Sequence, residues 1–273
     1  MKDPFSHLII GKAMQVHREL GPGLDEHFYH ELLVGRLTEA NVPVESKPRR
    51  NLMHRGIVAD ILEADLVFPT QLVTELKCLH GAFAPEHYVQ LACYLKFWNI
   101  STGLLMDFAK NSLIFQRVNF TTPPHPTLTA DAWLAQLDSV PLDAETRDIA
   151  QAVGRATGNI LAAHGLGYRD TTYRGLLAAD LQADGIPCIS SPVAQVHAGP
   201  RLLGETACHC LVVRGRIGVL VLALRESLTA ADRAILQTYL RLLRLPLGVV
   251  INYGKQEFLH RWVTPPGSNL CLP

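Results

Sequence analysis

Three charged residues interrupt apolar stretches in the first half of the sequence: Asp65, Glu75 and Lys77. Residues two apart on a strand point to one face, so Glu75 and Lys77 should project together. Like charges directly opposite destabilise a sheet unless a positive group lies between them. Two carboxylates suit Mg²⁺ or Mn²⁺, and the neighbouring ammonium could orient or activate a water or offset a phosphate charge. The alternative is a solvated strand face on which Lys77 pairs with Glu75.

The strand pattern predicts how the two carboxylates meet. Residues 57–68 and 72–79 have the composition of strands, and residues 69–71 have that of a short turn. A three-residue turn would place Phe68 opposite Leu72. The same register would set the two carboxylates opposite each other on a twisted hairpin.

The surrounding sequence alternates helical and extended patterns. Helical spacing covers residues 8–20, 25–40 and 86–99, and a hairpin is expected from residues 102–107 and 112–118. The order helix, helix, strands, helix, strands is typical of an α/β fold with a mixed sheet flanked by helices.

Two further motifs accompany the charged cluster. Gln90 and Tyr94 are four residues apart on an expected helix and therefore share a face. Gly23, Glu26 and Tyr29 follow the pattern Gly-x-x-Glu-x-x-Tyr at the start of another helix.

In this order the motifs resemble the PD-(D/E)XK nuclease superfamily, and most closely its small prokaryotic branch of GxxExxY proteins. The similar segments are VHRELGPGLDEHFYHELL, ADLVF, VTELK and QLACYL. The resemblance implies a restriction-endonuclease-like α/β fold and a Mg²⁺-dependent or Mn²⁺-dependent nuclease. It implies metal ligands at Asp65, Glu75, the Leu76 carbonyl and Glu26. It also implies that Lys77 assists the attacking water and that Gln90 and Tyr94 support the site.

The only dense basic cluster lies just before the first of these strands, at Lys47, Arg49, Arg50 and Arg55. It has two interpretations that the sequence does not separate. One is a solvated loop, and the other is a rim that tracks the phosphates of a nucleic acid.

Two other groups of possible metal ligands have simpler explanations. His27, His30 and Glu31 could bind a transition metal, but exposed helix polarity explains them. Cys208 and Cys210 are too close together for one tetrahedral zinc and have no second pair at finger spacing, so we expect strand residues there.

An internal repeat organises the chain. The segment around Tyr94 matches that around Tyr239, 145 positions later, and Gly23 to Tyr29 matches Gly167 to Tyr173, 144 positions later. A colinear series of such matches predicts two tandem domains of this fold. We expect domains at residues 1–120 and 145–273, joined by a Pro-rich linker and short helix at 121–144.

The second repeat lacks the chemistry of the first. At the same offsets, Asp65, Glu75 and Lys77 become apolar, while Glu26 becomes an aspartate and Tyr94 is kept as Tyr239. One carboxylate without a partner cannot form a metal ligand set. We expect a structural pseudoenzyme domain that pairs with the first repeat inside one chain. The replacements are Asp170 for Glu26, Cys210 for Asp65, Leu220 for Glu75, Leu222 for Lys77 and Ile235 for Gln90.

Composition limits the class of protein. The chain has 273 residues, with 25 basic and 25 acidic side chains, so no overall positive field attracts nucleic acid. No apolar run reaches bilayer length, and six cysteines without an export signal suggest reduced thiols in the cytoplasm. We therefore expect a cytoplasmic nuclease acting on nucleic acid, DNA more than RNA, with no membrane partner and with a homodimer as one option. The rival is a non-catalytic nucleic-acid-binding or protein-interaction scaffold with a vestigial site.

Overall fold

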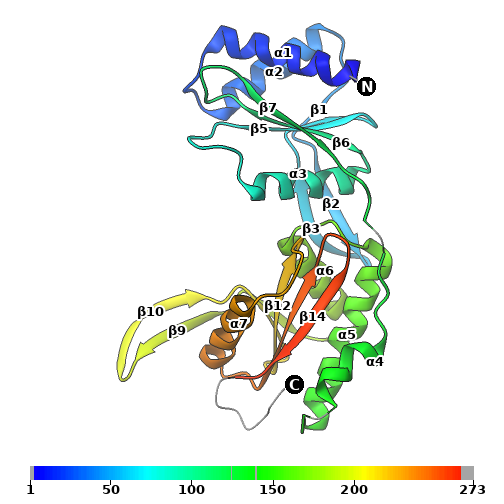
Figure 1. The fold of residues 1–273 in the computed structure, drawn as a ribbon, viewed down its shortest axis with the longest axis vertical. Helices are drawn as coiled ribbons and strands as arrows, with labels where there is room; N and C mark the ends of the chain where they lie inside the picture. The colour runs from blue at the N-terminus through cyan, green and yellow to red at the C-terminus, as the bar shows by residue number, and fades with distance from the viewer. Residues whose placement is uncertain (1–2, 124, 139, 266–273) are drawn as a thin grey trace. The chain divides into compact units, whose positions relative to one another are not determined.

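A five-stranded mixed sheet forms the centre of each half of the chain (Figure 1). The computed structural model describes residues 3–123, 125–138 and 140–265. The first compact unit comprises residues up to 52 together with 61–122, and the second comprises 53–60 together with residues from 123 onward. The domain limits expected from the sequence stay a prediction.

The first unit has two helices on one face of its sheet and one helix on the other (Figure 1). The sheet order is β1-β4-β5-β6-β7, with β5 and β6 parallel and the other pairs antiparallel. A separate two-stranded ribbon is formed by β2 and β3. The elements are α1 (Pro4–Leu20), α2 (Glu26–Glu39), β1 (Glu45–Ser46), β2 (Arg49–His54), β3 (Ile57–Glu63), β4 (Leu66–Phe68), β5 (Leu72–Lys77), α3 (Pro85–Trp98), β6 (Thr102–Asp107) and β7 (Ile114–Asn119).

The expectation of one continuous strand over residues 57–68 is wrong. The strand breaks at Ala64 and Asp65, because its first part pairs with β2 in the ribbon and its second part pairs with β5 in the main sheet. The expected register after the break is confirmed, since Phe68 pairs with Leu72. Thr70 takes the left-handed conformation that a three-residue turn requires.

The Gly-x-x-Glu-x-x-Tyr motif holds the α1–α2 turn. Helix α1 begins where Asp3 accepts hydrogen bonds from two backbone amides and ends at Gly21, whose φ of 70° favours glycine. The Tyr29 hydroxyl then donates to the Gly21 carbonyl at 2.6 Å and accepts from the Leu24 amide at 3.2 Å. Tyr29 is fully buried in the core that α1 and α2 share with the sheet.

The second unit repeats this architecture. Its sheet order is β8-β11-β12-β13-β14, and α7 covers the position that α3 covers in the first unit. The elements are α4 (Ala130–Leu134), the 3₁₀ helix η1 (Ala135–Leu137), α5 (Ala144–His164), α6 (Asp170–Ala183), β8 (Cys188–Ser190), β9 (Val193–Ala198), β10 (Arg201–Ala207), β11 (Leu211–Val213), β12 (Ile217–Ala223), α7 (Ala230–Leu243), β13 (Leu247–Tyr253) and β14 (Phe258–Val263).

The registers of the two sheets agree residue by residue. Leu66 pairs with Thr74 in the first sheet, and Leu211 pairs with Val219 at the same offset of 145 positions in the second. The Tyr173 hydroxyl donates to the Gly165 carbonyl at 2.7 Å, as Tyr29 does in the first unit. The repeat is therefore a duplication of the fold.

The linker helix packs on the second unit. The expected short helix is confirmed as α4 and η1, and Trp133 on it is 1% exposed. Its indole donates to the Ala150 carbonyl, and a Cβ on Gly154 would come within 2.4 Å of the ring. Cys208 and Cys210 lie buried in the connection between β10 and β11, so their expected place in a strand is wrong.

Candidate active site

Glu75 lies at the centre of the charged cluster in the first unit. It sits inside β5, pairs across the sheet with Leu105, and is only 3% exposed. Its Oε1 accepts hydrogen bonds from Lys77 Nζ and from Gln90 Nε2, both at 2.7 Å. Its Oε2 is buried and has no hydrogen-bond partner among the residues that the structure describes. An unpartnered buried carboxylate oxygen is unfavourable unless a further group binds it.

Asp65 lies beside Glu75 at the break between β3 and β4. Because Leu66 pairs with Thr74, the next position along the ladder sets Asp65 opposite Glu75. The Asp65 Oδ2 accepts a hydrogen bond of 2.8 Å from the Leu76 amide. The predicted approach of the two carboxylates is therefore present.

Burial and repulsion raise the pKa values of Glu75 and Glu26. Burial, followed by the charge of Asp65, raises the pKa of Glu75 from 4.5 to about 7. Burial and Asp65 also raise the pKa of Glu26, at the start of α2, above its ordinary value. Glu26 therefore approaches the cluster from the helix.

Lys77 supplies the positive charge of the cluster. Burial alone would lower the pKa of Lys77, but the carboxylates around it, led by Glu75, raise that pKa above its ordinary value. The ammonium therefore stays charged at neutral pH, and its side chain is 15% exposed. It can meet a substrate at the surface while it holds Glu75.

Helix α3 carries Gln90 and Tyr94, the two residues expected to share one helix face. Gln90 donates from the same Nε2 to Glu75 and, at 3.1 Å, to the Tyr94 hydroxyl. Tyr94 is 4% exposed. The pair therefore orients Glu75 from the helix side of the sheet.

Comparison with known proteins identifies the family. The family model described as the PD-(D/E)XK nuclease superfamily matches residues 3–118 and again residues 147–262. The chain belongs to the PD-(D/E)XK nuclease superfamily. Both repeats carry the fold of this superfamily, as two tandem α/β regions.

Other comparisons add little. The crystal structure of SSO0001 is similar at 21% identity, over 36% of this chain and 51% of that chain, with a TM-score of 0.30. The match thus spans about half the length of SSO0001. No curated protein sequence matches the chain. None of the helices within the described ranges combines the length and apolar composition that a bilayer span requires.

Members of the PD-(D/E)XK nuclease superfamily generally use divalent metals. Within residues 3–123, 125–138 and 140–265, no group of three or more His, Cys, Asp and Glu side chains is arranged to hold a metal ion. A smaller donor set would be formed by the carboxylates of Asp65 and Glu75, and an ion there would need backbone and water oxygens to complete its shell. Mg²⁺ is often bound by one or two carboxylates plus waters. The orphaned Glu75 Oε2 is the observation that fits such an ion.

The four residues of the basic cluster have different surroundings in the structure. Burial raises the pKa of Glu26, and the charge of Lys47 offsets part of that rise. The Lys47 amide donates to the Asp65 carbonyl, so Lys47 belongs to the surroundings of the site. Arg49 and Arg50 lie exposed on β2. Arg49 and Arg50 therefore belong to a strand, so the first of the two interpretations, a solvated loop, is wrong for them.

Arg55 does not join the other basic residues. It belongs to the second unit, where its guanidinium binds Asp180 at 3.2 Å and Asp184 at 2.7 Å. A guanidinium with two carboxylate partners has little positive charge left for a phosphate. The structure therefore gives Arg55 a structural role.

Sequence reasoning missed several residues that position the site. His30 is buried, and its Nε2 lies 3.3 Å from the Asp65 carbonyl, so the explanation by exposed helix polarity is wrong for His30. His27 and Glu31 are exposed, as that explanation expects. Asp107 accepts from the Leu79 amide at 3.0 Å, and Lys110 Nζ binds the Leu79 carbonyl. These contacts fix the segment that follows Lys77. The signal available was the repeat itself, because Asn252 and Lys255 occupy the equivalents of Asp107 and Lys110.

The second repeat has no such cluster at the equivalent positions. Cys210 is fully buried, and Leu220 and Leu222 on β12 are 6% and 7% exposed. These residues join the apolar core beneath α7. In the second repeat, apolar side chains that pack in the core therefore occupy the positions of the charged cluster.

Proposed function

We propose that the first unit is a metal-dependent nuclease that hydrolyses phosphodiester bonds of nucleic acid, with DNA as the preferred substrate. One observation carries the proposal. Glu75 is buried with a pKa near 7, is held by Lys77 and Gln90, faces Asp65, and keeps one oxygen without a partner. Structural carboxylates are normally saturated by hydrogen bonds, whereas strongly perturbed ones cluster at functional sites.

Each residue has a defined task in this proposal. Asp65 and Glu75, with the Leu76 carbonyl, would hold Mg²⁺ or Mn²⁺, which when bound polarises a phosphate and lowers the pKa of a bound water. Glu26 at the start of α2 is the further ligand that the family resemblance implies, although it does not form a three-carboxylate group with them in the described residues. Lys77 would orient the attacking water and offset the charge that develops on the phosphate. Gln90 and Tyr94 would fix the Glu75 carboxylate, since their hydrogen bonds constrain its orientation.

The proposal extends to partners and to the second repeat. Lys47, Arg49 and Arg50 are the candidates for following the phosphate backbone, because they precede the strand break that carries Asp65. The second repeat would be structural and would pair with the first in one cytoplasmic chain. Kinship with the GxxExxY branch remains a resemblance carried by Gly23, Glu26 and Tyr29.

A second candidate function is a non-catalytic scaffold that binds nucleic acid or protein. The balanced charge of the chain and the apolar second repeat favour it. In that case the charged cluster would be vestigial, and the protein would bind its partner without cutting it.

A cleavage assay separates the two functions. End-labelled single-stranded and double-stranded DNA and RNA are incubated with the full chain and Mg²⁺ or Mn²⁺, with a chelator as blank. The nuclease proposal expects cleavage that Asp65→Asn, Glu75→Gln and Lys77→Ala each abolish. Glu63→Gln, an exposed carboxylate on β3, is the matched control and should cut normally. Cleavage that survives all three variants would place the activity elsewhere, and binding without cleavage would favour the scaffold.

A further inference from the structure

The ribbon of β9 and β10 in the second unit exposes an unusual amount of apolar surface. Among the described residues, the four most exposed large hydrophobic side chains are Ile189, Val193, Leu202 and Leu203, at 61%, 63%, 51% and 57%. Three of them lie on the ribbon itself, which projects away from the sheet of its unit (Figure 1). A two-stranded ribbon is marginally stable alone in water, and exposed apolar patches mark contact surfaces.

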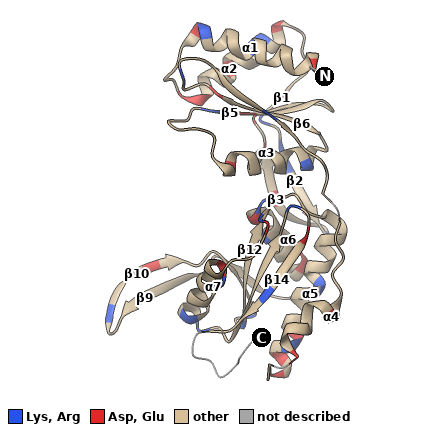
Figure 2. Cartoon of the chain, in the orientation of Figure 1, with Lys and Arg blue, Asp and Glu red and all other residues tan. Residues whose placement is uncertain are grey.

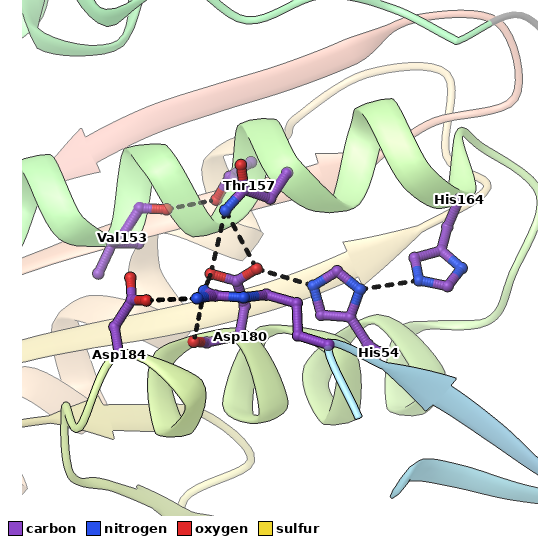
Figure 3. A network of polar contacts seen from close by, with 8 residues as sticks. His54, Val153, Thr157, His164, Asp180 and Asp184 are labelled. Carbon is purple, nitrogen blue, oxygen red and sulfur yellow. Dashed lines mark hydrogen bonds and ion pairs between the residues drawn. The ribbon is translucent and has the colours of Figure 1, made fainter. Parts of the chain in front are cut away.

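The repeat shows what such a ribbon does. The tip of the equivalent ribbon, residues 53–60 between β2 and β3, belongs to the second unit and packs on its helices α5 and α6. His54 Nε2 lies 2.7 Å from an oxygen of Asp180, which is fully buried on α6 (Figure 3). The other nitrogen of His54 lies 3.0 Å from His164 at the end of α5.

Two ion pairs, a side-chain hydrogen bond and a close backbone contact hold this tip against the helices. Arg55 binds Asp180 and Asp184, and Asp60 accepts a hydrogen bond from Thr172 near the start of α6. A Cβ on Gly175 would lie 2.0 Å from the Ala59 carbonyl oxygen, so only glycine permits this approach. The second unit thus shows one ribbon tip packed against a helix pair.

The equivalent helix pair in the first unit is not covered by a ribbon within the described part of the chain. In the second unit, Tyr168 and Thr172 are buried on the surface that receives the ribbon tip, at 5% and 0% exposure. Their equivalents, 144 positions earlier, are Leu24 and Phe28, which are 39% and 46% exposed. Among the described residues there is therefore one apolar ribbon that packs on no helix pair, β9–β10, and one apolar helix pair that receives no ribbon, α1–α2.

We propose that the β9–β10 ribbon of one chain docks on the α1–α2 surface of a second copy of the chain. Each chain offers both halves of the contact, so two chains can make it twice and close a dimer. Closure by repeated equivalent contacts is the common route to symmetric assemblies, because it leaves no ribbon free. Leu202 and Leu203 would then cover Leu24 and Phe28.

Differences between the two helix pairs indicate whether the proposed contact is polar or apolar. Glu31 on α2 is the equivalent of Gly175, the glycine that lets the Ala59 carbonyl approach α6 closely. The docked β9–β10 ribbon must therefore lie farther from α2 than the β2–β3 tip lies from α6. Larger side chains fill the wider gap, with Phe28 in place of Thr172. Arg36 takes the position of Asp180 and already pairs with two glutamates. The ion pairs that Asp180 makes in the second unit therefore have no counterpart here. The intermolecular contact is therefore apolar.

Sedimentation of the full chain tests the proposal. The wild type should sediment as a dimer at micromolar concentration, with twice the mass of one chain. Leu203→Asp and Phe28→Asp should each halve that mass, because a buried unpaired charge is unfavourable. Ile235→Asp, at an exposed apolar position on α7, is the matched control and should stay dimeric. A wild-type monomer at all concentrations, or a dimer that survives both variants, would overturn the proposal.

Cross-linking of mixed chains identifies the surfaces in contact. A chain with Leu203→Cys is mixed with a chain with Phe28→Cys and treated with a short bismaleimide, against a wild-type blank because Cys78 and Cys188 are partly exposed. The proposal expects a linked pair in the mixture and background in each chain alone. Linking of the Leu203→Cys chain to itself would show ribbon-to-ribbon pairing and contradict it. A monomer in which Phe28→Asp weakens binding to DNA would also contradict it, because the helix surface would then serve nucleic acid.

Discussion

Replacing Glu75 by glutamine should stabilise the metal-free first unit at alkaline pH. The raised pKa means that the folded state binds the Glu75 proton more tightly than the unfolded chain does. The stability associated with that proton is fully present below pH 4.5 and is lost as the pH rises through about 7. Glutamine carries no ionisable proton, so Glu75→Gln should escape this loss. Figure 2 marks the positions of the acidic and basic residues along the chain.

The magnitude follows from the shift. The pKa moves from 4.5 to about 7, and at about 1.36 kcal/mol for each pH unit this amounts to roughly 3 kcal/mol. The wild type should therefore lose up to about 3 kcal/mol of unfolding free energy, relative to Glu75→Gln, between pH 5 and pH 8. The weakened partnership with Lys77 lowers the stability of the variant by a constant amount and leaves this slope in place.

The assay must follow the first unit by itself. Hydrogen exchange of a peptide spanning β5, measured against urea in the presence of a chelator, reports the opening free energy of that unit. Measurements at pH 5, 6, 7 and 8 give the slope for the wild type, Glu75→Gln and the control Glu63→Gln. The control should run parallel to the wild type. A wild-type curve parallel to that of Glu75→Gln over this range would refute the reasoning, because Glu75 would then titrate as an ordinary exposed carboxylate.

Three further outcomes are expected. Gln90→Leu removes a hydrogen bond to ionised Glu75, so the pKa of Glu75 should rise and the pH–rate profile of cleavage should move to higher pH. Tyr29→Phe and Tyr173→Phe each remove an equivalent hydroxyl contact to a turn glycine, and urea denaturation should show similar losses of about 1–2 kcal/mol. Asp180→Asn should destabilise the second unit by about 3 kcal/mol near pH 7, because it breaks buried pairs. Hydrogen bonds, led by the one to His54, keep the pKa of Asp180 below its ordinary value despite burial, so this loss should vanish only in strong acid, as urea denaturation against pH would show.

Local patterns predicted most of the first unit. Helical spacing located α1, α2 and α3 to within four residues at each end, and the three-residue turn gave the register that brings Asp65 to Glu75. These features are determined by residues close together in the sequence, so local sequence patterns are enough to predict them. The repeat predicted the second sheet for the same reason, since its register follows that of the first.

Long-range contacts could not be predicted in this way. The β2–β3 ribbon was missed because β2 is rich in arginine and its tip is held by Asp180, 126 residues after His54. His30 looked like an exposed helix residue because nothing near it in the sequence shows that it reaches the Asp65 carbonyl. The strand break at Asp65 arises because two segments pair with different partners, which periodicity alone does not reveal.

The central claim is that the chain keeps one metal-dependent centre, in the first of two repeats. Titration of the chelator-treated full chain with Mn²⁺ in a calorimeter tests it most directly. We expect about one ion per chain, with binding abolished by Glu75→Gln and by Asp65→Asn and unaffected by Glu63→Gln. Absence of binding, two ions per chain, or binding that survives Glu75→Gln would contradict the claim.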